Sequence, residues 1–225
     1  MKRTSRILSI GVASVALAVA ARAAEVALTT TYHANDPIGR NVVMIESRAP
    51  LETMLTRTGN VVGEIKLNPQ NAWDNPQARF ELDMASLDTG IAMRNEHMRG
   101  DKWLDTAKYP KAVFTLTRIV VPENVRWAAH PLEDAKKLNY DVEGTLEMHG
   151  ATKPVQAKVE VIPIKGSGDT AQRLPGDLLH VRATFAFKLD EYGIDVPAPS
   201  RLKIANEQQV TVDIFTSTKL PEPKS

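Results

Sequence analysis

Hydrophobic and polar residues alternate along most of this 225-residue chain, in the period-two pattern of β-strands with one buried face. The alternation is clearest in six segments, which are residues 78–84, 114–121, 140–148, 155–161, 179–189 and 210–214. Two earlier segments, residues 41–47 and 61–67, are also predicted to be strands. The pattern therefore predicts an all-β domain of eight strands, either a closed antiparallel barrel or a sandwich.

The polar face of these predicted strands indicates which side meets water. It carries charged residues such as Glu81, Asp141 and Lys158, which lipid hydrocarbon would not tolerate. The apolar face is therefore predicted to point inward, where its side chains either line a ligand cavity or pack as an ordinary core. These inward residues are Phe80, Leu82, Phe114, Leu116, Tyr140, Val142, Leu146, Met148, Val159, Phe185, Phe187, Val212 and Ile214.

The connections between the predicted strands are uneven in length. A helix is predicted to begin after Thr89 as its N-cap and to end at Gly100. Residues 50–56 are predicted to form a helical turn, and residues 122–138 are an insertion predicted to be partly helical. Two tryptophans, Trp73 and Trp127, are predicted to anchor loops.

The first residues have the features of a signal peptide. Lys2, Arg3 and Arg6 precede an apolar run of mostly small residues, and Ala21-Arg22-Ala23 fits the small-x-small cleavage rule. The run is shorter than the roughly 20 residues of a membrane-spanning helix. We therefore expect residues 1–23 to be removed on export and residues 24–225 to form one domain.

Charge and cysteine content narrow the function classes. Loss of the signal peptide would remove four basic residues and no acidic ones, leaving 24 basic against 27 acidic residues and a formal charge of −3. A slightly acidic protein lacks the basic field that nucleic-acid binding requires. The chain contains no cysteine, so neither disulfides nor lipidation of a cysteine contributes to its stability or location.

Candidate chemistry is sparse. The five histidines, at positions 33, 97, 130, 149 and 180, show no metal-ligand spacing, and no nucleophile or phosphate-loop motif is present, so neither an enzyme nor a metal site or cofactor is expected. Arg94 and His97 share one face of the predicted helix, where they would either clasp a ligand head group or pair with Asp88, Asp101 or Asp105. Trp103 is predicted to form part of a lid nearby.

Several motifs resemble the YceI-like family of periplasmic polyisoprenoid-binding proteins. One combines Ser86 and Thr89 with Arg94 and His97, followed by Tyr-Pro and a Phe-containing strand at residues 109–114. The others are GTLEMHGATKPV at residues 144–155, FKLDEYGI at 187–194 and the closing strand at 207–214. The resemblance covers about residues 61–216, whereas the region before residue 61 and the insertion around Trp127 depart from the family pattern.

The resemblance implies a lipocalin-like, eight-stranded barrel in the periplasm that holds an isoprenoid, a quinone or a similar amphiphile. It would act as a carrier or sequestering protein without stable membrane insertion. Two other hypotheses stay open: a barrel filled by its own side chains that partners a membrane redox protein, and a lipid-modifying enzyme that uses Arg94 and His97. The oligomeric state is also open, a homodimer included.

Overall fold

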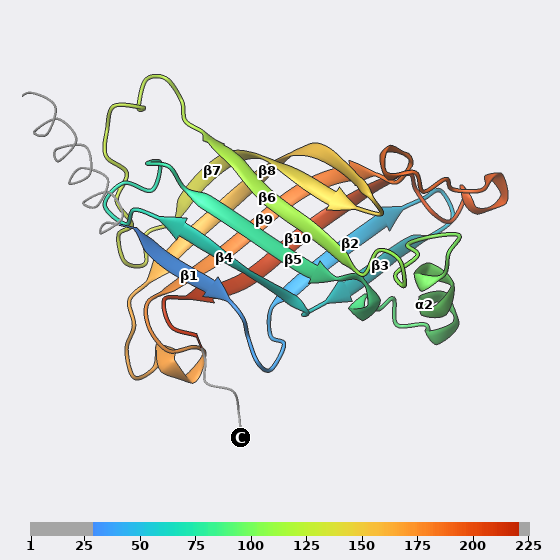
Figure 1. The fold of residues 1–225 in the computed structure, drawn as a ribbon, viewed down its shortest axis with the longest axis horizontal. Coiled ribbons are helices and arrows are strands. Elements are labelled where there is room, and N and C mark those ends of the chain that lie inside the picture. The colour runs from blue at the N-terminus through green and yellow to red at the C-terminus, as the bar shows by residue number, and fades with distance from the viewer. Residues whose placement is uncertain (1–28, 221–225) are drawn as a thin grey trace, which may run out of the picture.

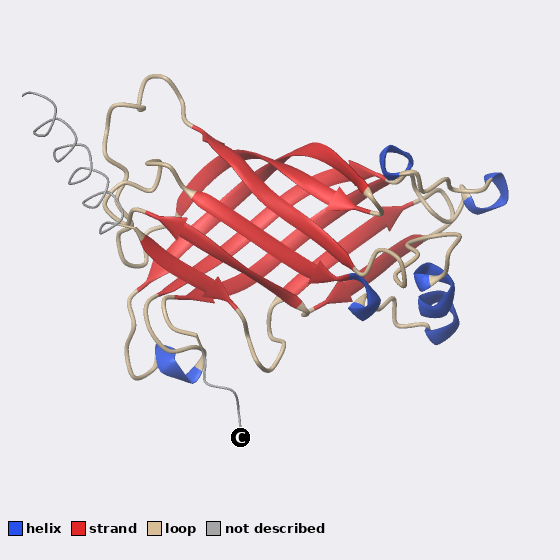
Figure 2. Ribbon diagram, in the orientation of Figure 1, coloured by secondary structure: helices blue, strands red, loops and turns tan. Residues whose placement is uncertain are grey.

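Residues 29–220 of the computed structural model form an antiparallel sheet rolled into a barrel, with a short helix at one end (Figures 1 and 2). The predicted signal peptide lies outside these described residues. The strands are β1 (Thr30–Ala34), β2 (Val42–Arg48), β3 (Thr53–Thr58), β4 (Val61–Leu67), β5 (Gln77–Asp83), β6 (Lys111–Val120), β7 (Leu138–Met148), β8 (Ala151–Ile164), β9 (Leu178–Lys188) and β10 (Glu207–Ser217). The helices are α2 (Ala92–Arg99) and the short 3-10 turns η1 (Met84–Ser86), η2 (Thr170–Gln172), η3 (Asp190–Tyr192) and η4 (Ala198–Ser200).

Eight of the strands close a ring, in the order β1-β4-β5-β6-β7-β8-β9-β10 and back to β1. The last step is the pairing of His33 in β1 with Ser217 in β10. The β2–β3 hairpin continues the sheet beside the ring, because β2 pairs with β10 between Gln208 and Asp213. The predicted eight-stranded antiparallel barrel is thus confirmed. The predicted strand at 41–47 is β2, and the short β1, which was not predicted, takes the closing position instead.

The predicted helical turn at residues 50–56 is wrong, because β3 occupies most of that segment. In β3, polar residues face the core and an apolar residue faces solvent. Thr56 and Thr58 are buried, whereas Leu55 is 51% exposed. Thr58 keeps its hydroxyl paired, since it lies 2.6 Å from Ser86 Oγ. A strand that buries hydroxyls and exposes leucine cannot be found from hydrophobic periodicity.

The predicted helix is present as α2, and it ends before Gly100 as expected. Its predicted N-cap is wrong, because Ile91 occupies the cap position and no side chain caps the helix. Thr89 instead binds Asn95 within the helix, with 2.7 Å between Thr89 Oγ1 and Asn95 Oδ1. The insertion at residues 122–138 contains turns and no helix, so its partly helical prediction is also wrong.

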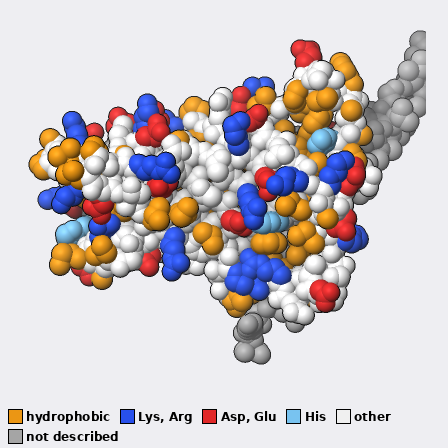
Figure 3. Space-filling view, turned by 180° about the vertical axis from the view of Figure 1, so that it is seen from behind, with side chains coloured by type: hydrophobic (Ala, Val, Ile, Leu, Met, Phe, Trp, Pro, Cys, Tyr) orange, Lys and Arg blue, Asp and Glu red, His pale blue; other side chains and the backbone are white. Residues whose placement is uncertain are grey.

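The outer face of the barrel carries mixed charges, and Figure 3 shows acidic and basic side chains lying beside one another over it. Many form ion pairs between neighbouring strands, such as Arg118 Nε to Glu143 Oε2 at 2.8 Å and Arg182 Nε to Asp213 Oδ2 at 3.0 Å. Exposed pairs of this kind contribute at most about 1 kcal/mol each. The stability of the barrel therefore depends mainly on its apolar interior.

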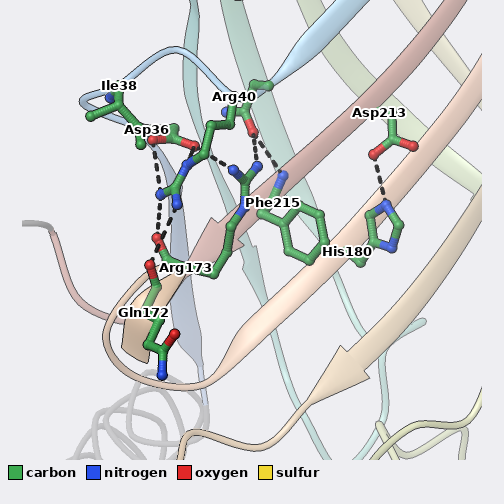
Figure 4. A network of polar contacts seen from close by, with 9 residues as sticks. Asp36, Ile38, Arg40, Gln172, Arg173, His180, Asp213 and Phe215 are labelled. Carbon is green, nitrogen blue, oxygen red and sulfur yellow. Dashed lines mark hydrogen bonds and ion pairs between the residues drawn. The ribbon is translucent and has the colours of Figure 1, made fainter. Parts of the chain in front are cut away.

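A buried polar network fixes the segment between β1 and β2 (Figure 4). The Asp36 side chain is only 1% exposed, and its Oδ2 lies 2.9 Å from both Arg40 Nε and Arg173 Nη1. The Arg173 guanidinium lies over the Phe215 ring at 4.6 Å, and Asn41 Oδ1 accepts a hydrogen bond from the Phe215 amide at 3.0 Å. These contacts attach the 35–41 segment to β10 and to the loop before β9.

Replacing Asp36 by asparagine should destabilise the fold, because Arg173 would lose its carboxylate partner in a largely buried position. We expect a loss of about 2 to 3 kcal/mol at pH 7, measured by urea unfolding. Burial opposes ionisation of Asp36, but hydrogen bonds from Arg40 and the Ile38 amide and the charges of both arginines together hold its pKa below the usual value.

A carboxylate with a lowered pKa in the folded state stabilises the protein above its unfolded pKa of about 3.9 and loses that contribution in acid. The difference in the free energy of unfolding between wild type and Asp36→Asn should therefore become smaller as the pH falls below about 4. The exposed Asp169 provides the control, since Asp169→Asn should change little. A difference in unfolding free energy that stays constant down to pH 2 would contradict the lowered pKa of Asp36.

Candidate functional site

An apolar cavity of about 210 Å³ lies inside the barrel. Side chains from β2 and from β4 through β10 line it. All thirteen residues predicted to point inward are among them, although their role in holding a ligand stays a prediction. The volume exceeds that of an engineered cavity of roughly 150 Å³ that stays dry and binds benzene. The barrel interior is thus large enough for an apolar ligand and is not filled by its own side chains.

The cavity runs along the barrel, and different elements cover its two ends. At one end lie α2, the β7–β8 turn and the segment between β9 and β10, and Met84 and Met148 line the cavity there. The other end is covered by the connections β4–β5, β6–β7 and β8–β9, from which Ala72 and Leu132 reach the cavity. In Figure 1, α2 lies at the right and the β6–β7 connection at the left.

Two glycines leave space for phenylalanine rings in the cavity wall. A Cβ on Gly144 would lie 2.5 Å from Phe114 Cε2, and one on Gly63 would lie 2.6 Å from Phe80 Cδ1. Gly63 pairs directly with Phe80 across β4 and β5, so the ring occupies the space over the missing side chain. Gly63 is therefore a site of close approach between the two strands. These rings pack against backbone of the neighbouring strand, which is how glycines and aromatics cooperate in curved sheets.

The predicted head-group and lid residues lie at the α2 end but do not line the cavity. Arg94 forms an ion pair with Glu52, at 2.6 Å between Arg94 Nη2 and Glu52 Oε1, so the expected aspartate partners are wrong. His97 is exposed on α2. Trp103 is partly buried and packs against the core, as a covering residue would. The structure therefore brings neither Arg94 nor His97 to the ligand space.

Sequence reasoning missed an aromatic cluster at the opposite end. His130 stacks on Trp73 with 4.3 Å between ring centroids, and its edge meets Tyr140 at 5.6 Å. Backbone bonds hold the two loops together, with the Ala72 amide donating to the His130 carbonyl at 2.9 Å. Trp73 thus anchors its loop as predicted, whereas Trp127 is 85% exposed and anchors nothing. The spacing of His130 and Trp73 along the chain gave no signal of their contact.

Burial favours the neutral forms of His130 and Tyr140 in this cluster. Burial, and to a lesser degree the charge of Lys136, lowers the pKa of His130 below its ordinary value. Burial raises the pKa of Tyr140 to about 12. Both side chains are therefore neutral at neutral pH.

Among residues 29–220, no group of three or more His, Asp or Glu side chains lies close enough to hold a metal ion. Within the same range, no helix has the length and apolar character needed to cross a bilayer.

A closed antiparallel barrel around an apolar cavity defines a small-ligand-binding β-barrel protein. The chain matches the YceI-like domain over residues 38–216 and belongs to that family. The match covers every strand of the barrel except β1, which lies before it.

Relatives and solved structures agree with this family. A UPF0312 protein of Pseudomonas syringae pv. tomato is 31% identical over 120 residues, which is 53% of each chain. Protein YceI of Escherichia coli O157:H7 is 35% identical over 98 residues, or 42% of each chain. The chain thus spans about half the length of the curated relatives that it matches.

Two solved structures share the fold at low sequence identity. BcnA of Burkholderia cenocepacia has a TM-score of 0.59 at 19% identity, covering 79% of this chain and 97% of its own. A polyisoprenoid-binding domain from Saccharophagus degradans, described as implicated in plant cell wall breakdown, has the same TM-score and identity and covers 84% and 98%. These likenesses establish the shared fold.

Replacing Gly144 by alanine should narrow the cavity, because the added methyl would meet Phe114 and also the Thr115 carbonyl at 2.7 Å. Overpacking of this kind typically costs about 1 to 3 kcal/mol. Urea unfolding should show that loss, and a structure of the variant should show a displaced Phe114 ring. Gly168→Ala is the matched control, since a Cβ there meets nothing within 4 Å. Equal stability of both variants would count against the packing described here.

Proposed function

We propose that this protein is a periplasmic carrier or sequestering protein that binds one polyisoprenoid or similar amphiphilic lipid, a quinone among the candidates. The tail of the lipid would lie inside the barrel, in contact with the thirteen inward residues predicted from the sequence. Export would follow from the signal peptide predicted at residues 1–23. The single observation that carries the proposal is the apolar cavity along the barrel interior.

The physical case rests on hydrocarbon transfer. Burial of a methylene group in an apolar site contributes about 0.8 kcal/mol, so a tail of many carbons could bind tightly even after the cost of ordering it. The cavity wall is almost entirely hydrocarbon, and Leu146, Val159 and Phe185 from three neighbouring strands are part of it. The polyisoprenoid-binding domain with the same fold supports this ligand class.

The two other hypotheses have less support. A barrel filled by its own side chains would leave no cavity of this size. A lipid-modifying enzyme using Arg94 and His97 would need those groups beside the ligand, whereas neither lines the cavity.

Mature protein purified from the periplasm without detergent should retain about one lipid per chain. Native mass spectrometry would show the added mass, and organic extraction would identify an apolar-tailed molecule. The variant Leu146→Asp should lose the lipid, because it buries a carboxylate in the cavity wall. It should also be less stable for the same reason.

Thr115→Asp is the matched control for this variant. Thr115 is exposed on β6, next to the Phe114 that pairs with Leu146, so an aspartate there should leave the lipid bound. Wild-type protein that is free of lipid and takes up no added isoprenoid would refute the carrier function and favour the filled barrel.

A bulkier residue in the wall should change which tails fit. Phe114→Trp should shorten the longest tail accommodated, measured as the relative affinities of geraniol, farnesol and geranylgeraniol. Thr115→Trp places the same ring on the outer face and should leave the preference unchanged. An unaltered preference in Phe114→Trp would show that Phe114 does not contact the tail.

A further inference from the structure

The aromatic cluster beneath the β6–β7 connection contains polar groups that have no hydrogen-bond partner among the described residues. The hydroxyl of Tyr140, a cavity-lining residue, is buried without a hydrogen-bond partner in residues 29–220. The indole Nε1–H of Trp73, in the same aromatic cluster, is also buried and unpaired within that range. Leaving a buried donor unpaired lowers stability, so the retention of these two donors calls for an explanation.

Backbone contacts hold these donors in place. Besides the bond between Ala72 and His130, the Leu132 amide donates to the Pro69 carbonyl at 2.8 Å, and the His130 amide donates to Asn71 Oδ1 at 3.2 Å. His130 is therefore fixed between the Trp73 and Tyr140 rings. The Tyr140 hydroxyl is thereby prearranged on the cavity wall, and His130 brings the insertion, where the sequence departs from the family pattern, against the Tyr140 ring.

The surroundings favour an uncharged ligand group. Within residues 29–220, no Lys or Arg lines the cavity and Glu81 is the one acidic lining residue. Its carboxylate is engaged by Arg79 and Lys111 on the outer face. The nearby Lys136 is paired with Glu133 at 2.6 Å. An anionic head group such as a phosphate would therefore be desolvated without a cation to balance it, which is costly.

We propose that the polar end of the bound lipid lies at this end of the barrel, opposite α2, and that Tyr140 donates a hydrogen bond to an uncharged carbonyl oxygen of its head group. His130 lies between the Tyr140 and Trp73 rings and holds both in place. The tail then extends toward Met84 and Met148. This inference rests on the proposed lipid-binding function and specifies the chemistry of its head-group site.

Three probes with the same tail test the inference on delipidated mature protein: farnesylacetone, farnesyl phosphate and the hydrocarbon farnesane. Their Kd values would be measured by competition against a fluorescent fatty acid. The ketone should bind most tightly. Tyr140→Phe should weaken ketone binding about three- to tenfold, the range expected for one hydrogen bond, and should leave farnesane unchanged.

Tyr192→Phe is the matched control. Tyr192 also has a buried hydroxyl without a partner in the described residues, but it does not line the cavity, so its loss should not affect any probe. Trp73→Phe keeps a ring against His130 and removes a donor that does not line the cavity, so it should change ketone binding less than Tyr140→Phe does.

The outcomes separate this inference from the proposed function. If none of the probes binds, the carrier function fails and the inference falls with it. If all three bind equally and Tyr140→Phe changes nothing, the lipid carrier stands and the head-group site is refuted. Tightest binding of the phosphate would refute the uncharged head group. Because the hydroxyl is unpaired, Tyr140→Phe should not lower stability without ligand, and a clear loss would show a structural role instead.

Discussion

The architecture depends on β10, which pairs with both β2 and β1. Its first half pairs with β2, and its last residue pairs with β1, so one strand both extends the sheet and closes the ring. The chain must therefore turn sharply between β1 and β2, and the buried Asp36 with Arg40 and Arg173 fixes that turn. Closure of the ring separates an apolar interior from water, while β3 stays at the edge of the sheet.

The interior stays open because aromatic side chains of the wall pack over glycines of the neighbouring strands. Phe80 and Phe114 occupy the space over Gly63 and Gly144, and the lumen between them remains available. An eight-stranded barrel lies at the size where its interior can be either filled or hollow. In this protein, Gly63 on β4 and Gly144 on β7 leave the rings space at the wall, and this favours a hollow interior.

The sequence was most informative where strands are long and half-buried. Period-two alternation located eight of the ten strands, and all thirteen residues that it predicted to point inward line the cavity. It failed for β1, which is only five residues long, and for β3, which buries threonines and exposes Leu55. Arg94 and His97 were singled out by their helical spacing, and neither lines the cavity. The Trp73–His130–Tyr140 cluster depends on two loops that meet only in the folded chain, and no local pattern encodes that meeting.

The neighbourhood of β1 and β10 also constrains how the barrel can form. Residues 30–34 and residue 217 must meet before the ring is complete, so the closing contact has nearly the largest sequence separation available in the described chain. Contacts of such long range are slow to form, because the intervening chain must be ordered first. A polypeptide that emerges progressively from a ribosome or a translocation pore therefore remains an unclosed sheet, with exposed strand edges, until its final strand has appeared.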